Sequence, residues 1–290
     1  MKALSRRTKT YYYILIPILV LFFLFNTWPL LNGIFYSFTN YKGYGTYDMV
    51  GGRNYVDLFQ DSRVGNSYLF TFKYAICGTI LVNVIALLLA LGLNSKIKGK
   101  DALRGIYFVP NILGGLVVGY IFSFFFTYIL PAFGQAIGAD WLASSWLAST
   151  DWAWVAVLIV GVWQAVAMNT IIYISGLQTV PSEVYEASVL DGTSRSREFW
   201  KVTLPLIFPF VGINLVLSTK NMLMVFDQIM SLTSGGPAQS TESISFLIYN
   251  NGMSGGQFGF QSANAVLFFV IIVLFSVFQL RTMNSKEEQL

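Results

Sequence analysis

The chain has 290 residues, of which 55% are hydrophobic and 11% charged, where ordinary soluble domains have about 25% charged residues. Its mean hydropathy is +0.60. These values exclude a soluble domain with one buried core and predict an all-α membrane protein that crosses the bilayer several times. The chain contains no histidine and one cysteine, Cys77, which excludes a Ser-His-Asp triad, histidine metal ligands and an internal disulfide. We therefore expect no catalytic residue, metal or cofactor.

Six apolar stretches are long enough to cross a bilayer as helices. The first follows a short basic segment at 1–10. It is too long for the apolar region of a signal peptide, so we expect it to be retained. The transmembrane domain then covers 11–282 and leaves a short tail at 283–290. The expected spans are about 11–38, 67–93, 105–128, 153–179, 206–230 and 261–280.

Basic residues gather in every second connection between the spans. The N-terminus, the second and fourth connections and the tail hold Lys2, Arg6, Arg7, Lys9, Lys96, Lys98, Lys100, Arg104, Arg195, Arg197, Lys201, Arg281 and Lys286. The other connections hold only Lys42, Arg53 and Arg63. Lys and Arg favour cytoplasmic loops, so both termini and the loop at 180–205 are expected to be cytoplasmic. The net charge of +4 is then loop charge and does not indicate nucleic-acid binding.

The loop at 180–205 is a polar island between two apolar runs. A helix is expected at its start, where the negative charge of Glu183 suits the helix dipole. Gly192 supplies the conformational freedom that ends this helix. Either of the two hydroxyl residues that follow can cap a second helix through Trp200, and Pro205 marks its limit.

A run of residues in this loop resembles the EAA signature of bacterial ABC importer permeases, in particular the maltose-type sugar branch. The matching residues are Glu186, Ala187, Ser188, Leu190, Asp191, Gly192, Phe199, Thr203, Leu204 and Pro205. The resemblance implies a type I ABC importer permease fold and a coupling helix that sits in a cleft of a cytoplasmic ATPase. The coupling residues that it implies are Glu183, Glu186, Ala187, Ser188, Asp191, Gly192, Leu204 and Pro205. An ordinary amphipathic loop helix is the alternative.

Two further stretches, within 226–241 and 54–61, resemble the same family, so the likeness covers most of the chain. It implies import of a sugar, with a di- or oligosaccharide favoured, across the bacterial plasma membrane. The implied partners are a second homologous permease, two copies of the ATPase, an extracytoplasmic sugar-binding protein and membrane lipid. No nucleic-acid partner is expected.

The chain lacks a phosphate-binding loop of the G-x-x-x-x-G-K-[ST] type, so the ATPase must be another polypeptide. Ser254–Gln257 mimics part of an ABC ATPase signature but falls on the outer side, where we expect a flexible turn. Two other classes stay open: a secondary transporter with Lys220 and Asp227 as ion-coupling groups, and a membrane enzyme or scaffold without an ATPase. Neither needs the loop from Glu186 to Pro205.

Polar residues inside spans are the candidates for a substrate path. In the fifth span, Asn214, Ser218, Asn221 and Gln228 fall at i, i+4, i+7 and i+14, on one face of a continuous helix. Such a face should meet protein or a watery cavity, and amides suit sugar hydroxyls. Residues of the fourth span that could contribute are Trp163, Gln164 and Asn169. The alternative is that the polar face only holds helices together.

Other polar and small residues inside spans have structural explanations. Lys220 and Asp227 lie at i and i+7 of the same expected helix, roughly 10 Å apart, which is too far for a direct pair. Asp227 and Lys73 lie near expected span ends, where charged side chains can reach the interface. Gly115 and Gly119 form a small-xxx-small pair that predicts close helix packing.

Overall fold

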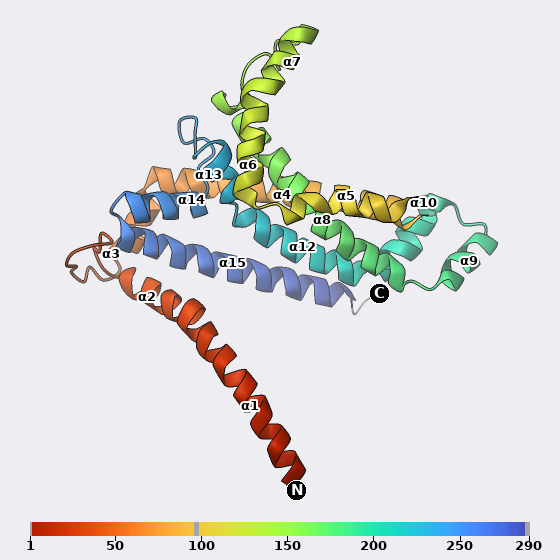
Figure 1. Cartoon of the computed structure of the whole chain (residues 1–290), viewed down its shortest axis with the longest axis horizontal. Helices are drawn as coiled ribbons and strands as arrows, with labels where there is room; N and C mark the ends of the chain where they lie inside the picture. Colours follow the sequence, from red (N-terminus) through yellow and green to blue (C-terminus); the bar gives the residue numbers. More distant parts are fainter. Residues whose placement is uncertain (1, 96–98, 288–290) are drawn as a thin grey trace. The chain divides into compact units, whose positions relative to one another are not determined.

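The computed structural model describes residues 2–95 and 99–287, and these residues form helices joined by loops and turns (Figure 1). Lys96, Lys98 and the last three residues of the tail lie outside the described residues. The chain divides into two compact units. The first contains residues 1–62 and 247–270, and the second contains residues 63–246 and 271–290.

The label α denotes an α-helix and the label η a short turn of another helix type. Among the described residues, η3 is a 3-10 turn, and η1, η2, η4 and η5 are π-helical turns. Within residues 2–95, they are α1 (Lys2–Phe22), η1 (Phe23–Thr27), α2 (Trp28–Tyr36), α3 (Arg53–Gln60) and α4 (Ser62–Asn94). The next are α5 (Lys100–Ile112), α6 (Gly115–Phe124), η2 (Phe125–Ile129), α7 (Leu130–Ile137), η3 (Trp146–Ala148) and α8 (Ala153–Thr179). The loop region holds α9 (Ser182–Leu190), α10 (Arg195–Glu198), η4 (Phe199–Thr203) and α11 (Leu204–Leu206). The last are α12 (Phe208–Leu223), α13 (Asp227–Leu232), α14 (Ile244–Tyr249), η5 (Asn250–Ser254) and α15 (Phe258–Glu287).

Five helices among the described residues are long and apolar enough to cross a membrane, and a bent pair adds a sixth. The five run over Tyr11–Tyr36, Ser62–Asn94, Gly115–Ile137, Ala153–Thr179 and Phe258–Met283. The bent pair is Arg195–Leu206 with Phe208–Leu223. The expected multi-pass helical architecture is confirmed.

The chain departs from the single helix expected over 105–128. Helix α5 ends at Ile112, and α6 starts at Gly115 after an extended Leu113 and Gly114. Helical structure then continues to Ile137, into the region expected to be a loop. The two glycines at the break lower the helix propensity, although the stretch stays apolar throughout.

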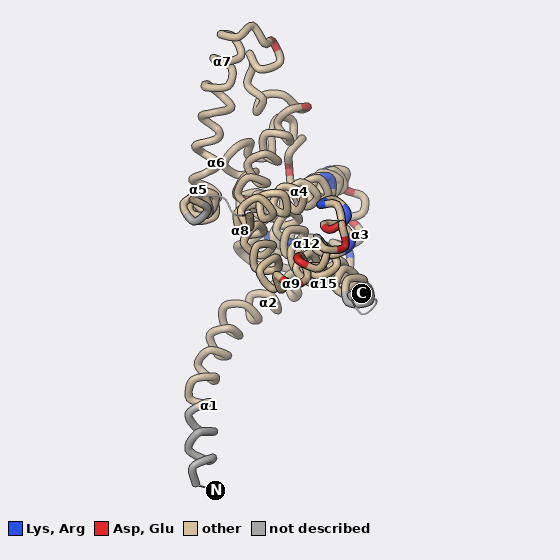
Figure 2. Tube along the Cα trace, turned by 90° about the vertical axis from the view of Figure 1, so that its right-hand side faces the viewer, with Lys and Arg blue, Asp and Glu red and all other residues tan. Residues whose placement is uncertain are grey.

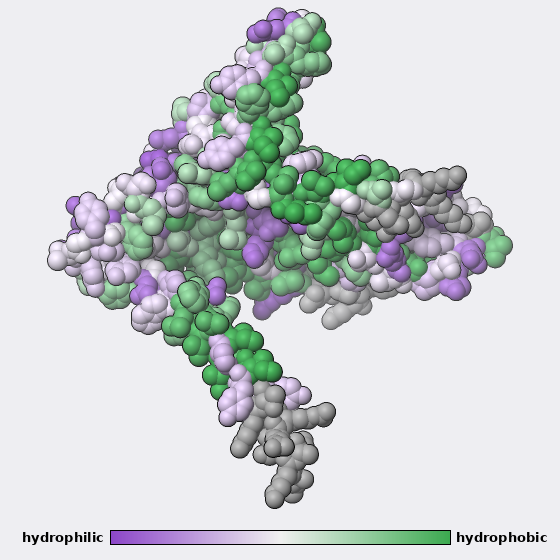
Figure 3. Space-filling view, viewed as in Figure 1, coloured by the Kyte–Doolittle hydropathy of each residue, from purple (hydrophilic) through white to green (hydrophobic). Residues whose placement is uncertain are grey.

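The surface of α6 is apolar and uncharged, as expected for a helix in contact with lipid. Helices α6 and α8 contain no charged residue (Figure 2). The visible face of α6 is mainly hydrophobic (Figure 3), and Val117, Ile121 and Phe124 each expose more than half of their surface. Such a continuous apolar surface suits lipid or another membrane helix.

Small residues let α6 and α13 pack closely. A Cβ atom added at Gly115 would lie 2.7 Å from the Cβ of Asp227, and one added at Gly119 would collide with the Ser231 side chain. The close packing predicted for the glycine pair is confirmed. Gly161 of α8 likewise leaves room for the hydroxyl of Tyr74 from α4.

The polar fifth span is not one helix. Helix α12 ends at Leu223, and α13 begins at Asp227 after a short non-helical segment. Ser243 donates a 2.8 Å hydrogen bond to the Val225 carbonyl, which satisfies a backbone group that the break leaves free. The expectation that Gln228 shares a helix face with Asn214, and that Asp227 shares a helix with Lys220, was therefore wrong.

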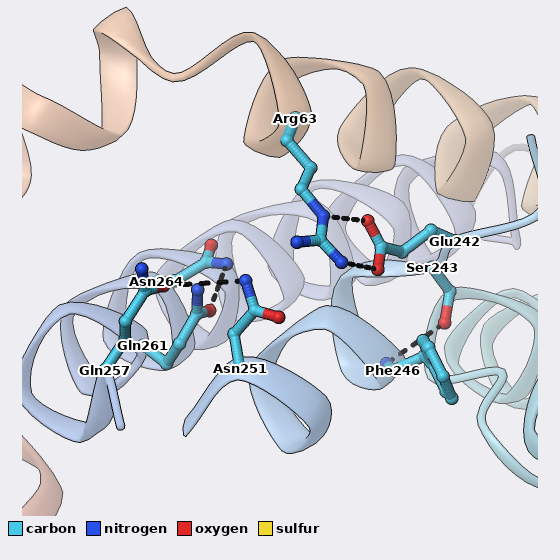
Figure 4. A network of polar contacts seen from close by, with 8 residues as sticks. All are labelled: Arg63, Glu242, Ser243, Phe246, Asn251, Gln257, Gln261 and Asn264. Atoms are coloured by element: carbon cyan, nitrogen blue, oxygen red, sulfur yellow. Dashed lines mark hydrogen bonds and ion pairs between the residues drawn. The ribbon is translucent and has the colours of Figure 1, made fainter. Parts of the chain in front are cut away.

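In the first unit, aromatic and amide side chains organise the segment between α2 and α3. Asn54 donates to the carbonyls of Ser37 and Thr39 at 2.8 and 2.9 Å. The ring of Tyr36 stacks on Tyr41 with 4.7 Å between centroids. Near the start of α15, Asn264 donates to Gln261 (Figure 4). The stretch at 54–61 thus begins with a residue that fixes the preceding turn.

In the second unit, an ion pair ties the start of α4 to the segment before α14 (Figure 4). Arg63 donates from Nε and from a terminal nitrogen to the two carboxylate oxygens of Glu242, both at 2.7 Å. The side chain of Glu242 is 3% exposed. Thr71 accepts a 3.0 Å hydrogen bond from the Ile244 amide nearby. Residues 242–244 are therefore held to α4, and the same segment supplies the hydrogen bond to Val225 at the break between α12 and α13.

Candidate functional site

The loop at 180–205 starts with α9, whose end has a specific backbone arrangement. Gly192 has a φ of +67°, in the left-handed region that favours glycine. The Thr193 amide donates to the Ser188 carbonyl at 3.1 Å, which is the long-range bond of a Schellman motif. The prediction that Gly192 ends the helix is confirmed, and the reason is its backbone conformation.

The second helix of the loop is longer than expected. Ser194 occupies the N-cap position of α10, although its side chain makes no capping hydrogen bond. Helical structure runs past Trp200 through η4 and α11 to Leu206, and Pro205 lies inside this continuous helix, shortly after the π-helical turn η4 and one residue before its end. The helix then bends by 73° into α12.

The loop presents charged and apolar side chains together. Glu186, Ala187 and Asp191 are exposed, whereas Ser188 is buried, with 7% exposure. Glu183 and Gly192 are also exposed, and Leu204 and Pro205 are half-buried. Leu190 is 88% exposed and Trp200 64% exposed. Apolar side chains this exposed on a polar loop are typical of an interaction surface.

A second feature is a polar hollow, which we define by the residues Tyr74, Asn111, Gly115, Gly161, Gln164, Ala165, Asn221, Met222, Val225, Asp227 and Gln228. Its volume is about 250 Å³. The wall comes from α4, α5, α6, α8, α12 and α13, including both breaks in the helical spans. Three of the predicted path residues, Gln164, Asn221 and Gln228, meet here.

Amide groups connect the two breaks. Gln228 of α13 donates to Gln164 of α8 at 2.7 Å. The Gln164 amide nitrogen in turn lies 3.5 Å from the carbonyls of Pro110 and Leu113, where α5 ends. A helix end leaves carbonyls without partners, and Gln164 lies where it can satisfy them. The hollow therefore has walls of positioned donors and acceptors.

Asn214 and Ser218 lie elsewhere, in a buried polar cluster between α4, α8 and α12. Asn83 donates to Ser218 at 2.8 Å and accepts from the hydroxyl of Tyr173 at 2.8 Å. Both Asn214 and Ser218 are fully buried, and the Asn214 amide has no hydrogen-bond partner among the described residues. The expected single polar face is thus divided: Asn214 and Ser218 are buried by helix packing, whereas Asn221 and Gln228 line the polar hollow.

The remaining predicted path residues do not line the polar hollow. The ring of Trp163 packs against Phe122 at 5.3 Å and borders an apolar groove between α4, α5 and α8. Asn169 donates to the Ala165 carbonyl of its own helix. Sequence reasoning missed Asn111, Asn83 and their neighbours, although an isolated asparagine in an apolar run was a usable signal.

A family model described as "Binding-protein-dependent transport system inner membrane component" matches residues 82–283. The chain belongs to this family. As an inner-membrane component, the permease crosses the membrane several times. Permease subunits of this family have no ATPase site of their own, because the ATPase is a separate subunit.

Two relatives of the permease match nearly its whole length. The multiple sugar-binding transport system permease protein MsmF of Streptococcus mutans is 39% identical, over 93% of each chain. The probable starch degradation products transport system permease protein AmyD of Thermoanaerobacterium thermosulfurigenes is 32% identical, over 90% of this permease and 89% of the relative.

A solved structure shows the same fold. The bacterial alginate ABC transporter in complex with its alginate pentasaccharide-bound periplasmic protein contains a chain that matches with a TM-score of 0.85. The match covers 97% of the permease and 96% of that chain, at 21% identity. The fold is therefore that of a type I ABC importer permease, as predicted.

Proposed function

We propose that the permease carries a sugar, with a di- or oligosaccharide favoured, from an extracytoplasmic binding protein across the membrane. A second homologous permease and two copies of a cytoplasmic ATPase complete the importer. Sugar-transport permeases among the relatives support this substrate class. Neither an ion-coupled transporter nor a scaffold needs the exposed loop at 180–205.

The polar hollow is the observation that carries the sugar path. Gln164, Asn221 and Gln228 bring amides from three helices to one place, where they can donate to and accept from sugar hydroxyls. Small-molecule sites usually measure about 300–1,000 Å³, and the hollow is slightly smaller. A second permease facing it would supply the missing wall.

The loop from Glu183 to Pro205 is the proposed ATPase-coupling element. Its exposed Leu190 and Trp200 flank the Schellman turn at Gly192, so the loop offers an apolar edge of fixed shape. Glu186 and Asp191 add polar groups on the same exposed segment. This combination suits a cleft in a partner protein.

Replacing Asn221 with alanine should weaken the apparent sugar affinity of the assembled importer roughly ten- to hundredfold. Losing one buried hydrogen-bond partner costs about 1–3 kcal/mol, and 1.4 kcal/mol corresponds to a factor of ten. Transport at several sugar concentrations measures the effect. Asn83→Ala is the matched control: it removes hydrogen bonds to Ser218 and Tyr173, and should lower the melting temperature while leaving the concentration dependence unchanged. A lower melting temperature with unchanged affinity for Asn221→Ala would assign this side chain to packing.

A cysteine at Ser254 tests the proposed orientation, in which the termini and the loop at 180–205 are cytoplasmic. Ser254 is exposed, and Cys77→Ala removes the native thiol. The new cysteine should react with a membrane-impermeant thiol reagent added to intact cells, since this segment is on the outer side by the charge rule. Labelling only after the membrane is opened would invert the topology and the coupling assignment.

A further inference from the structure

We propose that Asp227 makes the polar hollow selective against negatively charged sugars, so that neutral and amino sugars pass while uronic acids and sugar phosphates are disfavoured. This inference rests on the proposed sugar path through the hollow. Asp227 is the one carboxylate residue among the lining residues, and none of them is Lys or Arg. An acidic sugar would therefore bring a second negative charge into the hollow without meeting a cation.

The position of Asp227 is fixed by close packing. A Cβ atom added at Gly115 would lie 2.5 Å from the Oδ2 atom of Asp227, so the carboxylate lies directly against the first turn of α6. The partial positive charge at a helix N-terminus attracts a carboxylate group placed against it. This contact keeps the charge in place and still leaves a net negative wall.

Two basic residues of the neighbouring helices, Lys73 and Lys220, are directed elsewhere. The Lys73 ammonium lies 3.8 Å from the ring centroid of Trp154, and Lys220 is exposed and does not line the hollow. Within the described residues, Asp227 forms no ion pair. A carboxylate that has no cation beside it can accept hydrogen bonds from sugar hydroxyls, or from the ammonium group of an amino sugar.

The expected selectivity follows from Coulomb's law. Two like charges about 6 Å apart, at an effective dielectric constant between about 20 and 80, repel enough to weaken binding roughly three- to hundredfold. We expect about a tenfold difference between matched neutral and acidic sugars.

Saturation-transfer NMR on the purified, assembled importer without its binding protein tests this, because the method detects weak binding at the permease itself. The probes are maltotriose and two analogues, one ending in glucuronic acid and one in glucosamine. For the unmodified importer, the acidic probe should bind about tenfold more weakly than maltotriose. Asp227→Asn should reduce this ratio at least threefold and weaken the amino probe relative to maltotriose.

Two variants control for trivial effects. Asp151→Asn removes the same charge from an exposed position outside the hollow, and should leave the ratio of acidic to neutral binding unchanged. Gln228→Glu adds a carboxylate to the hollow and should make the acidic probe bind still more weakly relative to maltotriose, which keeps the test decisive if Asp227→Asn fails to fold. Equal binding of the acidic and neutral probes to the unmodified importer would overturn the proposed charge selectivity and leave the proposed sugar path standing. If none of the three probes binds the unmodified importer, both the charge selectivity and the proposed sugar path are overturned.

Discussion

Replacing Gly192 with valine should abolish sugar uptake, while the permease still inserts into the membrane. The φ of +67° at this position is costly for any residue with a Cβ atom, by about 1–2 kcal/mol, and more for a β-branched one. The ending of α9 would change, and with it the position of Leu190 and the start of α10. Uptake by the importer and co-purification of the ATPase measure the loss.

The surroundings of Gly192 make the experiment specific. A Cβ atom added there meets no atom within 4 Å, so the effect expected of the substitution comes from the backbone conformation and not from a clash of the Cβ. Gly192→Asn is the matched variant, because asparagine tolerates the left-handed region, and it should retain most of the uptake. Gly192→Asp tests charge at the same position. Normal transport and normal ATPase co-purification with Gly192→Val would remove the coupling role from this turn.

Removing the side chain of Arg63 should lower the free energy of unfolding by about 3 kcal/mol. The variant leaves the buried carboxylate of Glu242 without the guanidinium that balances its charge, and breaking a buried pair costs about 3–5 kcal/mol. The lower end applies because the Arg63 side chain is 34% exposed. Denaturation of the purified permease in detergent measures this difference.

The chain offers its own control for this pair. Arg53 and Asp57 form an ion pair at 3.7 Å within α3, with side chains 77% and 48% exposed. Exposed pairs of this spacing contribute about 0.3–0.5 kcal/mol, so Arg53→Ala should have little effect. Equal destabilisation by Arg63→Ala and Arg53→Ala would show that burial of Glu242 does not matter. The double variant Arg63→Met with Glu242→Met should recover most of the loss, since no buried charge remains.

The apolar helices and the turn at Gly192 were readable from sequence because their signals are local. Long apolar runs require helices in a bilayer, and Gly192 ends a helix through its own backbone freedom. The small residues Gly115 and Gly119 also indicated close packing before any partner helix was known. In each case the physical cause lies within a few residues of its effect.

The breaks in the spans depend on distant residues and were not readable. The segment after Leu223 leaves the helix without a proline or glycine, and its Val225 carbonyl is satisfied by Ser243, which lies 18 residues later. Likewise, Gln164 reaches carbonyls more than 50 residues earlier in the chain. A hydropathy pattern does not report such long-range hydrogen bonds. Three polar residues of the hollow could therefore be predicted from sequence, but not the way in which the helices surround them.

The 73° bend at Ile207 determines what kind of motion the loop can transmit. Ile207 is fully buried, and Pro209 lies in the first turn of α12, so the corner is held by packing and prearranged by its sequence. A straight rod would convert a push on α10 and α11 into sliding of α12 along its own axis. Because the corner is close to a right angle, most of the same push acts across α12 and becomes a torque. A displacement of the loop would thus move the far end of α12 sideways, and Asn221 lines the hollow at that end.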